Sequence, residues 1–325
     1  MTHSVPQIIK IPLPTPYPVG DVNTYFIDGP EPILIDTGVY SSKSLKALSD
    51  GLEAHGRKLT DIRRILITHD HYDHAGAALH LSQICPATLR LHEKGTLTLR
   101  REPETIARLR DFALRCGVPA EAVDRAFQAF AAGAHFGNLE AKPHKVEYIK
   151  GGEVIDAGDG LTLEIIPAPG HSPDGVAFFD PRGGELFCGD LLLPKITPNP
   201  SLHFDPRDNW RRTRPLVDYL DSLDRVARLP ISVGHPGHGA DIPDFRGLIA
   251  RNKEFLADRK QCYAVQISVG PTNPYELARA VFGDLDVINQ FLALSETVAY
   301  LDLLERDGEI EVDWGDKIIE VRSQA

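Results

Sequence analysis

Apolar residues in the first third of the chain follow two different periods. Leu45, Leu48 and Leu52 are spaced as on one face of a helix, which predicts a helix over residues 42–55. A second helix is predicted over 75–83. Short apolar runs bounded by turn residues predict strands at residues 7–12, 23–28, 32–38, 63–67 and 88–92. Strands that alternate with helices are typical of an α/β fold rather than an all-helical one.

Residues 100–145 have a different character and predict a helical insertion. Helices are expected over 102–116 and 120–132, with Pro119 and two glycines between and after them. Phe127, Phe130 and Phe136 fit two interpretations, which both stay open. The segment either forms a cap beside a functional site or uses these rings to pack its own small core.

Beyond the insertion the pattern returns to strands, predicted at 145–148, 161–166, 176–179, 185–188 and 231–233, with a helix over 208–227. The tail then predicts three helices, over 244–265, 274–282 and 295–306. Asn273 and Ser295 are the expected N-caps of the last two. A hairpin is predicted from residues 309–312 and 317–321. This order is that of a winged helix, so residues 251–325 are expected to form a domain separate from residues 1–250.

The densest chemical signal follows the strand predicted at 63–67. His69, Asp70, His71, Asp73 and His74 place three imidazoles and two carboxylates within six positions. Imidazole nitrogens and carboxylate oxygens are the ligands that zinc and similar divalent metals take in proteins. The cluster therefore predicts a metal site.

Three more residues of ligand type follow predicted strands in the same way. His171 comes after 161–166, Asp190 after 185–188 and His238 after 231–233, each beside a glycine. Loops at strand ends are where α/β proteins place functional groups. Glycine fits there because the backbone must turn sharply to aim a side chain.

The set of motifs closely resembles the metallo-β-lactamase-fold hydrolases, over roughly residues 7–250. All motifs occur in the family's order. They are Leu34-Ile35-Asp36-Thr37-Gly38, His69-x-His71-x-Asp73-His74, Ala168-Pro169-Gly170-His171-Ser172, Cys188-Gly189-Asp190 and Pro236-Gly237-His238-Gly239. The resemblance implies an αββα sandwich, here with the helical insertion and with a winged-helix-like tail of the kind that some family members carry.

The resemblance also implies a site for two divalent metal ions, with zinc expected and iron or manganese as alternatives at the same ligands. Asp190 would bridge both metals, and Asp73 would also be the residue able to pass a proton. The first metal would take His69, His71 and His171, and the second would take Asp73, His74 and His238. A hydroxide held between two such metals attacks a polarised carbonyl.

Four neighbouring residues are ambiguous from sequence. Asp36 fits either a partner that fixes a ligand's tautomer or a buried turn-capping residue, and the two roles are compatible. His238 is favoured over His235 as a ligand because of its Pro-Gly-His-Gly context. Tyr72 fits contact with substrate and packing equally. Cys188 fits a buried apolar position better than a functional one.

Charge bears on the substrate. The chain has a net charge of −11. Residues 1–250 carry 27 Lys and Arg against 32 Asp and Glu, and residues 251–325 carry 8 against 14. Binding to nucleic acid favours a basic surface, so no DNA partner is expected. The leading hypothesis is a hydrolase of a small carbonyl substrate, whether thioester, lactone or lactam. The alternatives are a single-strand RNA endonuclease of the related winged-helix group and a non-catalytic metal-binding regulator.

Other features of the sequence concern the compartment. Cys85, Cys116, Cys188 and Cys262 lie far apart, which fits reduced thiols in a cytoplasmic protein better than a disulfide framework. Neither a signal peptide nor a transmembrane helix is expected. A homodimer is considered, with the tail and insertion offering surfaces.

Overall fold

The structure, a computed structural model, describes residues 6–95, 103–133, 136–137, 145–270 and 273–324. Contacts divide the chain into two compact units. Unit 1 contains Met1–Leu97, Ala134–Pro198 and Ser222–Ile249, and unit 2 contains Thr98–Gly133, Asn199–Asp221 and Ala250–Ala325. Each unit is described by itself.

The first sheet of unit 1 has six strands within the described residues, in the order β1-β2-β3-β4-β5-β6. They are β1 (Gln7–Leu13), β2 (Val22–Asp28), β3 (Ile33–Ile35), β4 (Arg64–Leu66), β5 (Thr88–His92) and β6 (Lys145–Ile149). The strands from β3 to β6 run parallel. The carboxyl ends of β3 and β4 therefore meet at one edge, where the Asp36 amide donates to the Leu66 carbonyl at 2.9 Å.

The second sheet of unit 1 has the order β13-β10-β9-β8-β7 in the described part of the chain. Its strands are β7 (Val154–Gly158), β8 (Leu161–Pro167), β9 (Val176–Asp180), β10 (Glu185–Gly189) and β13 (Val233–Pro236). β10 and β13 pair in parallel, so the loops after them leave the same edge. The sequence did not predict β7, because glycines flank it and Asp156 interrupts its apolar residues.

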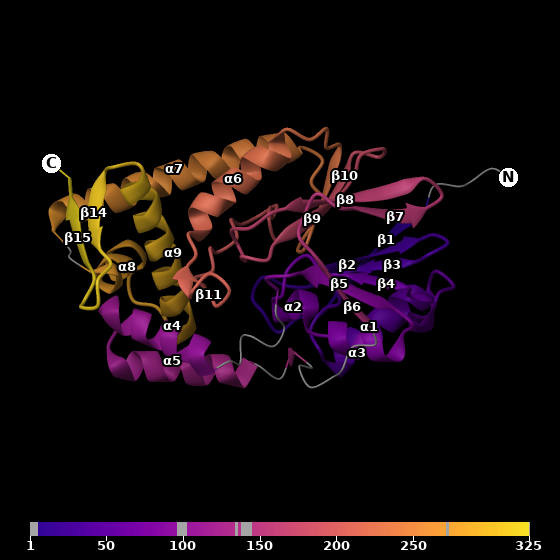
Figure 1. Cartoon of the computed structure of the whole chain (residues 1–325), viewed down its shortest axis with the longest axis horizontal. Helices are drawn as coiled ribbons and strands as arrows, with labels where there is room; N and C mark the ends of the chain where they lie inside the picture. The colour runs from indigo at the N-terminus through magenta and orange to yellow at the C-terminus, as the bar shows by residue number, and fades with distance from the viewer. Residues whose placement is uncertain (1–5, 96–102, 134–135, 138–144, 271–272, 325) are drawn as a thin grey trace. The chain divides into compact units, whose positions relative to one another are not determined.

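The two sheets of unit 1 lie in layers (Figure 1), and two apolar cores hold these layers together. Between the sheets, Ile35 and Leu66 pack in one buried cluster with Leu163, Phe178 and Phe187. Full burial of such a side chain contributes about 1.5 to 3 kcal/mol. The other face of the first sheet packs against helices α1 (Ser42–Glu53) and α3 (Ala78–Ile84). The short helices η1 (Leu59–Asp61) and α2 (Tyr72–Ala75) lie between them in the sequence, before and after β4. On the second sheet, Ser222 in α6 (Pro215–Ala227) donates to Pro169 O. The predicted α/β fold with an αββα arrangement is confirmed.

Unit 2 is mainly helical and has two small hairpins. The Phe127 and Phe130 rings of its α5 pack against Phe291 of its α9, with centroids 6.0 and 5.2 Å away, so these aromatic residues join the insertion to the tail. Its elements, with α6 and α7 shared with unit 1, are α4 (Pro103–Arg115), α5 (Ala120–Gly133), β11 (Phe204–Asp205), β12 (Arg211–Arg212), α7 (Phe245–Val269), α8 (Pro274–Phe282), α9 (Val287–Arg306), β14 (Ile310–Asp313) and β15 (Glu320–Ser323). The boundary at residue 250 and the winged-helix likeness stay predictions.

Two helix starts differ from the prediction. Helix α9 begins at Val287, where the Asp286 carboxylate accepts from the amides of residues 288 and 289, and not at Ser295. Ser295 is buried inside that helix, and its hydroxyl donates to Pro200 O at 2.6 Å. Helix α6 begins at Pro215 because Asn209 and Trp210 have φ of 47° and 59°, which no α-helix accommodates.

The helix predicted over 75–83 is present but begins later, at Ala78. The structure has α2, which ends at Ala75, and then α3, which begins at Ala78. Gly76 lies at this break, where an added Cβ would meet the carbonyl oxygens of Tyr72 and Phe136 at 2.2 and 2.4 Å. A close approach of backbone segments, which a sequence pattern does not reveal, therefore sets the break.

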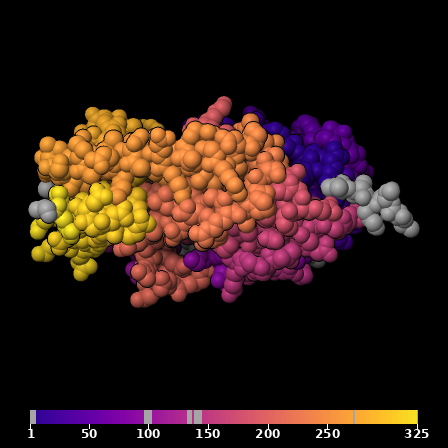
Figure 2. All heavy atoms as spheres, turned by 90° about the horizontal axis from the view of Figure 1, so that it is seen from above, coloured from indigo at the N-terminus to yellow at the C-terminus, as the bar shows by residue number. Residues whose placement is uncertain are grey.

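Helix α7 lies at the surface along much of its length, as its orange atoms in Figure 2 show. Its exposed apolar residues include Phe255, Val265 and Val269. Charged residues interrupt the apolar ones along this helix. Within the described residues, every helix is too short or too polar to cross a lipid bilayer.

We expect the loss of one partner from a buried ion pair to destabilise unit 2. Asp302 is fully buried in α9, and both its oxygens accept from the Arg212 guanidinium at 2.6 Å. Asp302→Ala leaves that cation without its partner and should lower the free energy of unfolding by about 3 to 5 kcal/mol, measured by urea denaturation. Asp284→Ala, which breaks the exposed pair with Arg279, is the control and should change little. Equal effects of the two variants would contradict the expectation.

Candidate metal centre

The histidine cluster lies where the first sheet ends. The chain leaves β4 at Leu66, passes Thr68 and His69, and enters the short helix α2 directly after His71. Asp73 and His74 lie in α2, so one helical turn aims their side chains toward the strand end that carries His69. Local backbone geometry alone thus places the side chains of this cluster close together.

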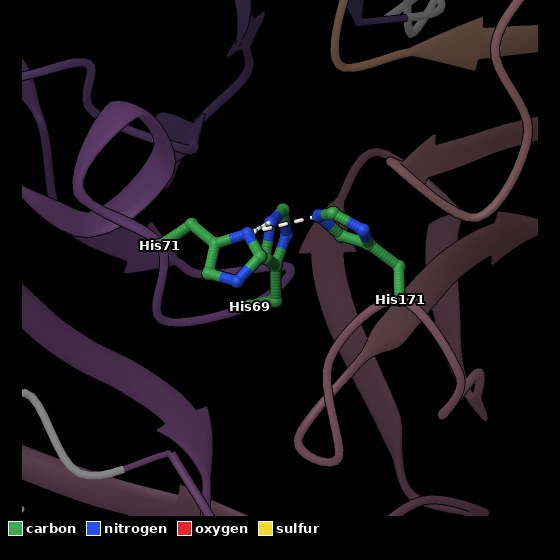
Figure 3. Close-up of side chains that lie close together, drawn as sticks. All are labelled: His69, His71 and His171. Atoms are coloured by element: carbon green, nitrogen blue, oxygen red, sulfur yellow. Dashed lines mark hydrogen bonds between the residues drawn. The ribbon is translucent and has the colours of Figure 1, made fainter. Parts of the chain in front are cut away.

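His171 completes a first group of three imidazoles (Figure 3). His71 Nδ1 lies 3.0 Å from His69 Nε2 and 2.9 Å from His171 Nε2. Three ring nitrogens therefore converge on one point, from the loop after β4 and the loop after β8. Converging neutral imidazoles are the ligand type of zinc sites.

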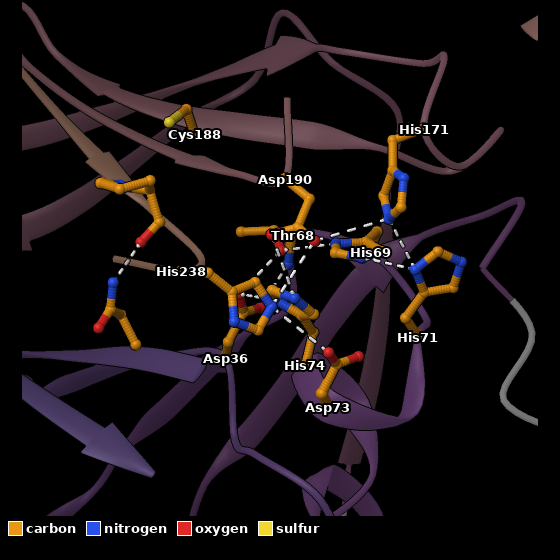
Figure 4. Close-up of polar contacts among 12 residues, drawn as sticks. Asp36, Thr68, His69, His71, Asp73, His74, His171, Cys188, Asp190 and His238 are labelled. Atoms are coloured by element: carbon orange, nitrogen blue, oxygen red, sulfur yellow. Dashed lines mark hydrogen bonds and ion pairs between the residues drawn. The ribbon is translucent and has the colours of Figure 1, made fainter. Parts of the chain in front are cut away.

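A second group contains Asp73, His74 and His238 (Figure 4). His238 Nε2 lies 3.4 Å from Asp73 Oδ2. Asp190 lies between the two groups. Its Oδ1 is 3.4 Å from His74 Nε2, and its Oδ2 is 3.6 Å from His171 Nε2 and 3.7 Å from His238 Nε2. One carboxylate thus faces both groups, as a bridging ligand would.

In three of the histidine ligands, the ring nitrogen Nδ1, which points away from the centre, has a partner of its own. Asp36 Oδ2 lies 2.8 Å from His74 Nδ1 and also accepts the Thr68 hydroxyl at 2.8 Å. His238 Nδ1 lies 2.8 Å from Asp21 O, and His69 Nδ1 lies 3.1 Å from Thr68 Oγ1. Donation of the Nδ1 proton of His74 and His238 to these oxygens leaves the Nε2 lone pair free for a metal. Asp36 Oδ1 also accepts from the Thr68 amide at 2.8 Å, so this buried side chain holds both a ligand's ring and the backbone of the loop after β4.

Electrostatics at the site favour bound cations. Burial disfavours the charged form of His74, but Asp190, Asp36 and Asp73 outweigh burial and raise the pKa of His74 well above its ordinary value. Burial likewise favours a neutral Asp190, but His74, His238 and His171 together lower the pKa of that carboxyl. Without a metal, protons on the imidazoles balance the carboxylates, and a metal ion would replace them.

The residues present fit divalent metal ions. His74 Nε2, Asp190 Oδ1 and His238 Nε2 are buried and have no hydrogen-bond partner in the described part of the chain. Orphaned buried polar atoms are costly unless something binds them. Gly237 leaves room beside them, because a Cβ there would lie 2.3 Å from Asp190 Oδ1 and 2.6 Å from His74 Cε1. The structure therefore brings together all the predicted ligands, which are His69, His71, Asp73, His74, His171, Asp190 and His238.

The ambiguous neighbours lie at different distances from this centre. His235 is outside the three groups, and its Nε2 faces Glu185 at 3.2 Å. Cys188 is buried, its Sγ lies 3.6 Å from Leu192 O, and burial raises the pKa of its thiol. Both roles of Tyr72, which is half-buried at the start of α2, stay open.

Sequence reasoning assigned no role to Asp21, Asn23 or Thr68, although all three contact the site or its loops. Thr68 directly precedes the cluster, which was a signal for it. Asp21 and Asn23 gave none, because an isolated bridge between Val22 and His238, far apart in sequence, brings their segment to the site.

The chain is similar to several known proteins in sequence and in structure. A family model described as the metallo-beta-lactamase superfamily matches residues 17–238. The chain is 28% identical over 315 residues to the probable metallo-hydrolase YqjP of Bacillus subtilis (strain 168), covering 95% of each protein. It is 24% identical over 286 residues to the atrochrysone carboxyl ACP thioesterase of Aspergillus fumigatus, covering 83% of this chain and 72% of that protein. A solved metallo-beta-lactamase family protein from Thermus thermophilus matches with a TM-score of 0.81 and 27% identity, over 98% of both chains.

The raised pKa of His74 makes metal binding depend on pH. A proton held by His74 must leave before its Nε2 can bind a metal, so affinity for Zn²⁺ should fall as the pH falls from about 8 to about 6. Titration calorimetry in buffers of different ionisation enthalpy should show proton release on binding. Binding with the same affinity across this range, without proton release, would contradict the electrostatic description.

Gly237→Ala tests the space at the centre. The added methyl group would overlap Asp190 Oδ1 and His74 Cε1, so bound metal should fall while the far-UV circular dichroism stays unchanged. Metal content after dialysis, measured by mass spectrometry, checks this outcome. Full metal content in Gly237→Ala would show that the centre is looser than the structure indicates.

Proposed function

Because the chain belongs to the metallo-beta-lactamase superfamily and is a metal-dependent hydrolase, we propose that it cleaves a thioester of a small acyl compound with two divalent metal ions. Zinc is the proposed metal, since the donors are imidazole nitrogens and carboxylate oxygens. Iron and manganese are alternatives at the same ligands.

The observation that carries the proposal is the position of Asp190 between two groups of ligands. Its Oδ2 lies 3.6 Å from His171 of the first group and 3.7 Å from His238 of the second, while its Oδ1 lies 3.4 Å from His74 of the second group. A single metal site has no need of a carboxylate aimed both ways. Metal ions held there would lower the pKa of water, supply a nucleophile at neutral pH and polarise the carbonyl under attack.

The chain's own residues position and balance this chemistry. Asp36 and the Asp21 carbonyl hold His74 and His238 with Nε2 aimed at the centre. Asp73 is the proposed proton carrier. Its carboxylate lies 3.4 Å from His238 Nε2. Burial would raise the pKa of Asp73, but His74 and His238 outweigh burial and lower this pKa, so the carboxyl group stays ionised. An ionised carboxylate at a reacting centre is able to accept a proton from water.

Two observations bear on the substrate, the first in favour of a thioester and the second against RNA. One is the likeness to a fungal protein named as an acyl-carrier thioesterase, at 24% identity. The other is the net charge of −11, which opposes binding to a polyanion such as RNA. Lactones and lactams, which have the same electrophilic carbonyl, are the next substrates to test.

The test compares the purified protein, loaded with Zn²⁺, on matched panels of thioesters, lactones, lactams and an unstructured oligoribonucleotide. Thioester hydrolysis should be the fastest reaction. In His171→Ala, a ligand of the first metal is lost, so kcat/KM should fall at least about 100-fold. His55→Ala is the matched control, because His55 is exposed and lies in none of the ligand groups.

Contradicting outcomes are distinct. Full activity in metal-free protein would refute a metal-dependent reaction. Metal-dependent cleavage of the oligoribonucleotide without any thioester hydrolysis would instead refute the proposed substrate. Failure to bind a second equivalent of Zn²⁺ would refute the two-metal site.

A further inference from the structure

The turn that carries His238 is held in place by strand β2, which lies more than two hundred positions earlier in the sequence. We propose that the Asn23 side chain is a positioning residue for this turn, and that it sets the affinity of the metal position formed by Asp73, His74 and His238. The inference rests on the proposed two-metal function and concerns one of its two positions.

Asn23 contacts the turn through both its side chain and its backbone. Its Nδ2 donates to Pro236 O at 2.9 Å and to Gly239 O at 3.0 Å. Its backbone amide donates to Gly237 O at 2.6 Å. The carbonyls accepting from this one residue therefore lie on both sides of His238 in the sequence.

Burial makes these contacts specific. Asn23 is 3% exposed, so water does not readily replace its amide protons. An asparagine amide has two N–H donors, and this one directs both at the turn. A second segment also contacts the turn, because the Gly237 amide donates to the carbonyl oxygen of Gly189, next to Asp190, at 2.8 Å.

The position of His238 depends on this arrangement. Its Nδ1 lies 2.8 Å from Asp21 O, two residues before Asn23, and Val22 forms an isolated bridge with His238. The segment 21–23 thus fixes the ring tautomer through Asp21 and the backbone of the turn through Asn23. Movement of the turn along β2 would take His238 Nε2 away from Asp73 and Asp190.

Other side chains also donate to the carbonyls that accept from the Asn23 amide, so we expect the fold to survive its removal. The Tyr25 hydroxyl also donates to Pro236 O, at 2.7 Å, and Lys10 Nζ donates to Gly239 O at 2.8 Å. Neither carbonyl is therefore left unpaired when the Asn23 amide is removed. What is lost is the group that bridges the two ends of the turn.

The experiment compares Asn23→Leu, which keeps the branching at Cγ but has no N–H donors, with Thr24→Val. Thr24 is the matched control because it is buried in the same strand and its hydroxyl donates to Ile11 O, away from the turn. Each protein is loaded with Zn²⁺ and dialysed against graded concentrations of a chelator, and retained metal is counted by mass spectrometry. Cobalt-loaded samples give the visible spectrum of each position.

In Asn23→Leu, one equivalent should be lost at a chelator concentration about 10- to 100-fold lower than in the wild type, as is usual when a partner behind a metal ligand is removed. The equivalent held by His69, His71 and His171 should be kept. Thr24→Val should match the wild type at both equivalents. His238→Ala identifies the cobalt band that belongs to the weakened position.

Three results separate the possible failures. If Asn23→Leu keeps both equivalents like the wild type, the positioning role is refuted while the two-metal function stands. If it loses both equivalents in parallel, Asn23 supports the fold as a whole and the inference is again refuted. If the wild type itself binds no second equivalent, the proposed function fails first. Asn23→Ala is the second variant, should the leucine prevent folding.

Discussion

The carboxylates of Asp36, Asp73 and Asp190 around the buried His74 impose the main electrostatic constraint on this structure. Asp36 lies 2.8 Å from one ring nitrogen of His74 and Asp190 lies 3.4 Å from the other. Buried carboxylates so close together require positive charge, whether from protons or from metal ions. The surrounding imidazoles supply nitrogen ligands as well as proton sites. The centre therefore favours bound cations, and metal ions held there would be able to activate water.

The two sheets provide the frame for this constraint. Parallel pairing of β3 with β4 and of β10 with β13 sends Asp36, the histidine cluster, Asp190 and the His238 turn out of strand ends in unit 1. Apolar packing between the sheets fixes those ends relative to each other. Contacts from β2 then hold the last turn. The rigid part of the fold lies behind the ligands, so small substitutions there are expected to change metal binding before they change the fold.

The alternation of strands and helices predicted the α/β class, and the resemblance of the motifs to the metallo-β-lactamase-fold hydrolases implied the αββα layers and the set of metal ligands. The candidate ligands could be recognised because each lies in a loop that follows an apolar strand, and a strand end is a local feature. The roles of Asp21 and Asn23 were not readable, because they arise from a bridge between Val22 and His238. The start of α9 was misjudged because Asp286 and Ser295 are both good capping residues, and tertiary packing buries the serine. Substrate identity depends on surfaces that strand patterns do not encode.

The most direct test of the account is a crystal structure of the zinc-loaded protein with anomalous diffraction measured at the zinc edge. The account predicts two anomalous peaks, one among His69, His71 and His171 and the other among Asp73, His74 and His238. Asp190 should contact both. A single peak, or two peaks without Asp190 between them, would contradict the two-metal centre on which the proposed hydrolysis depends.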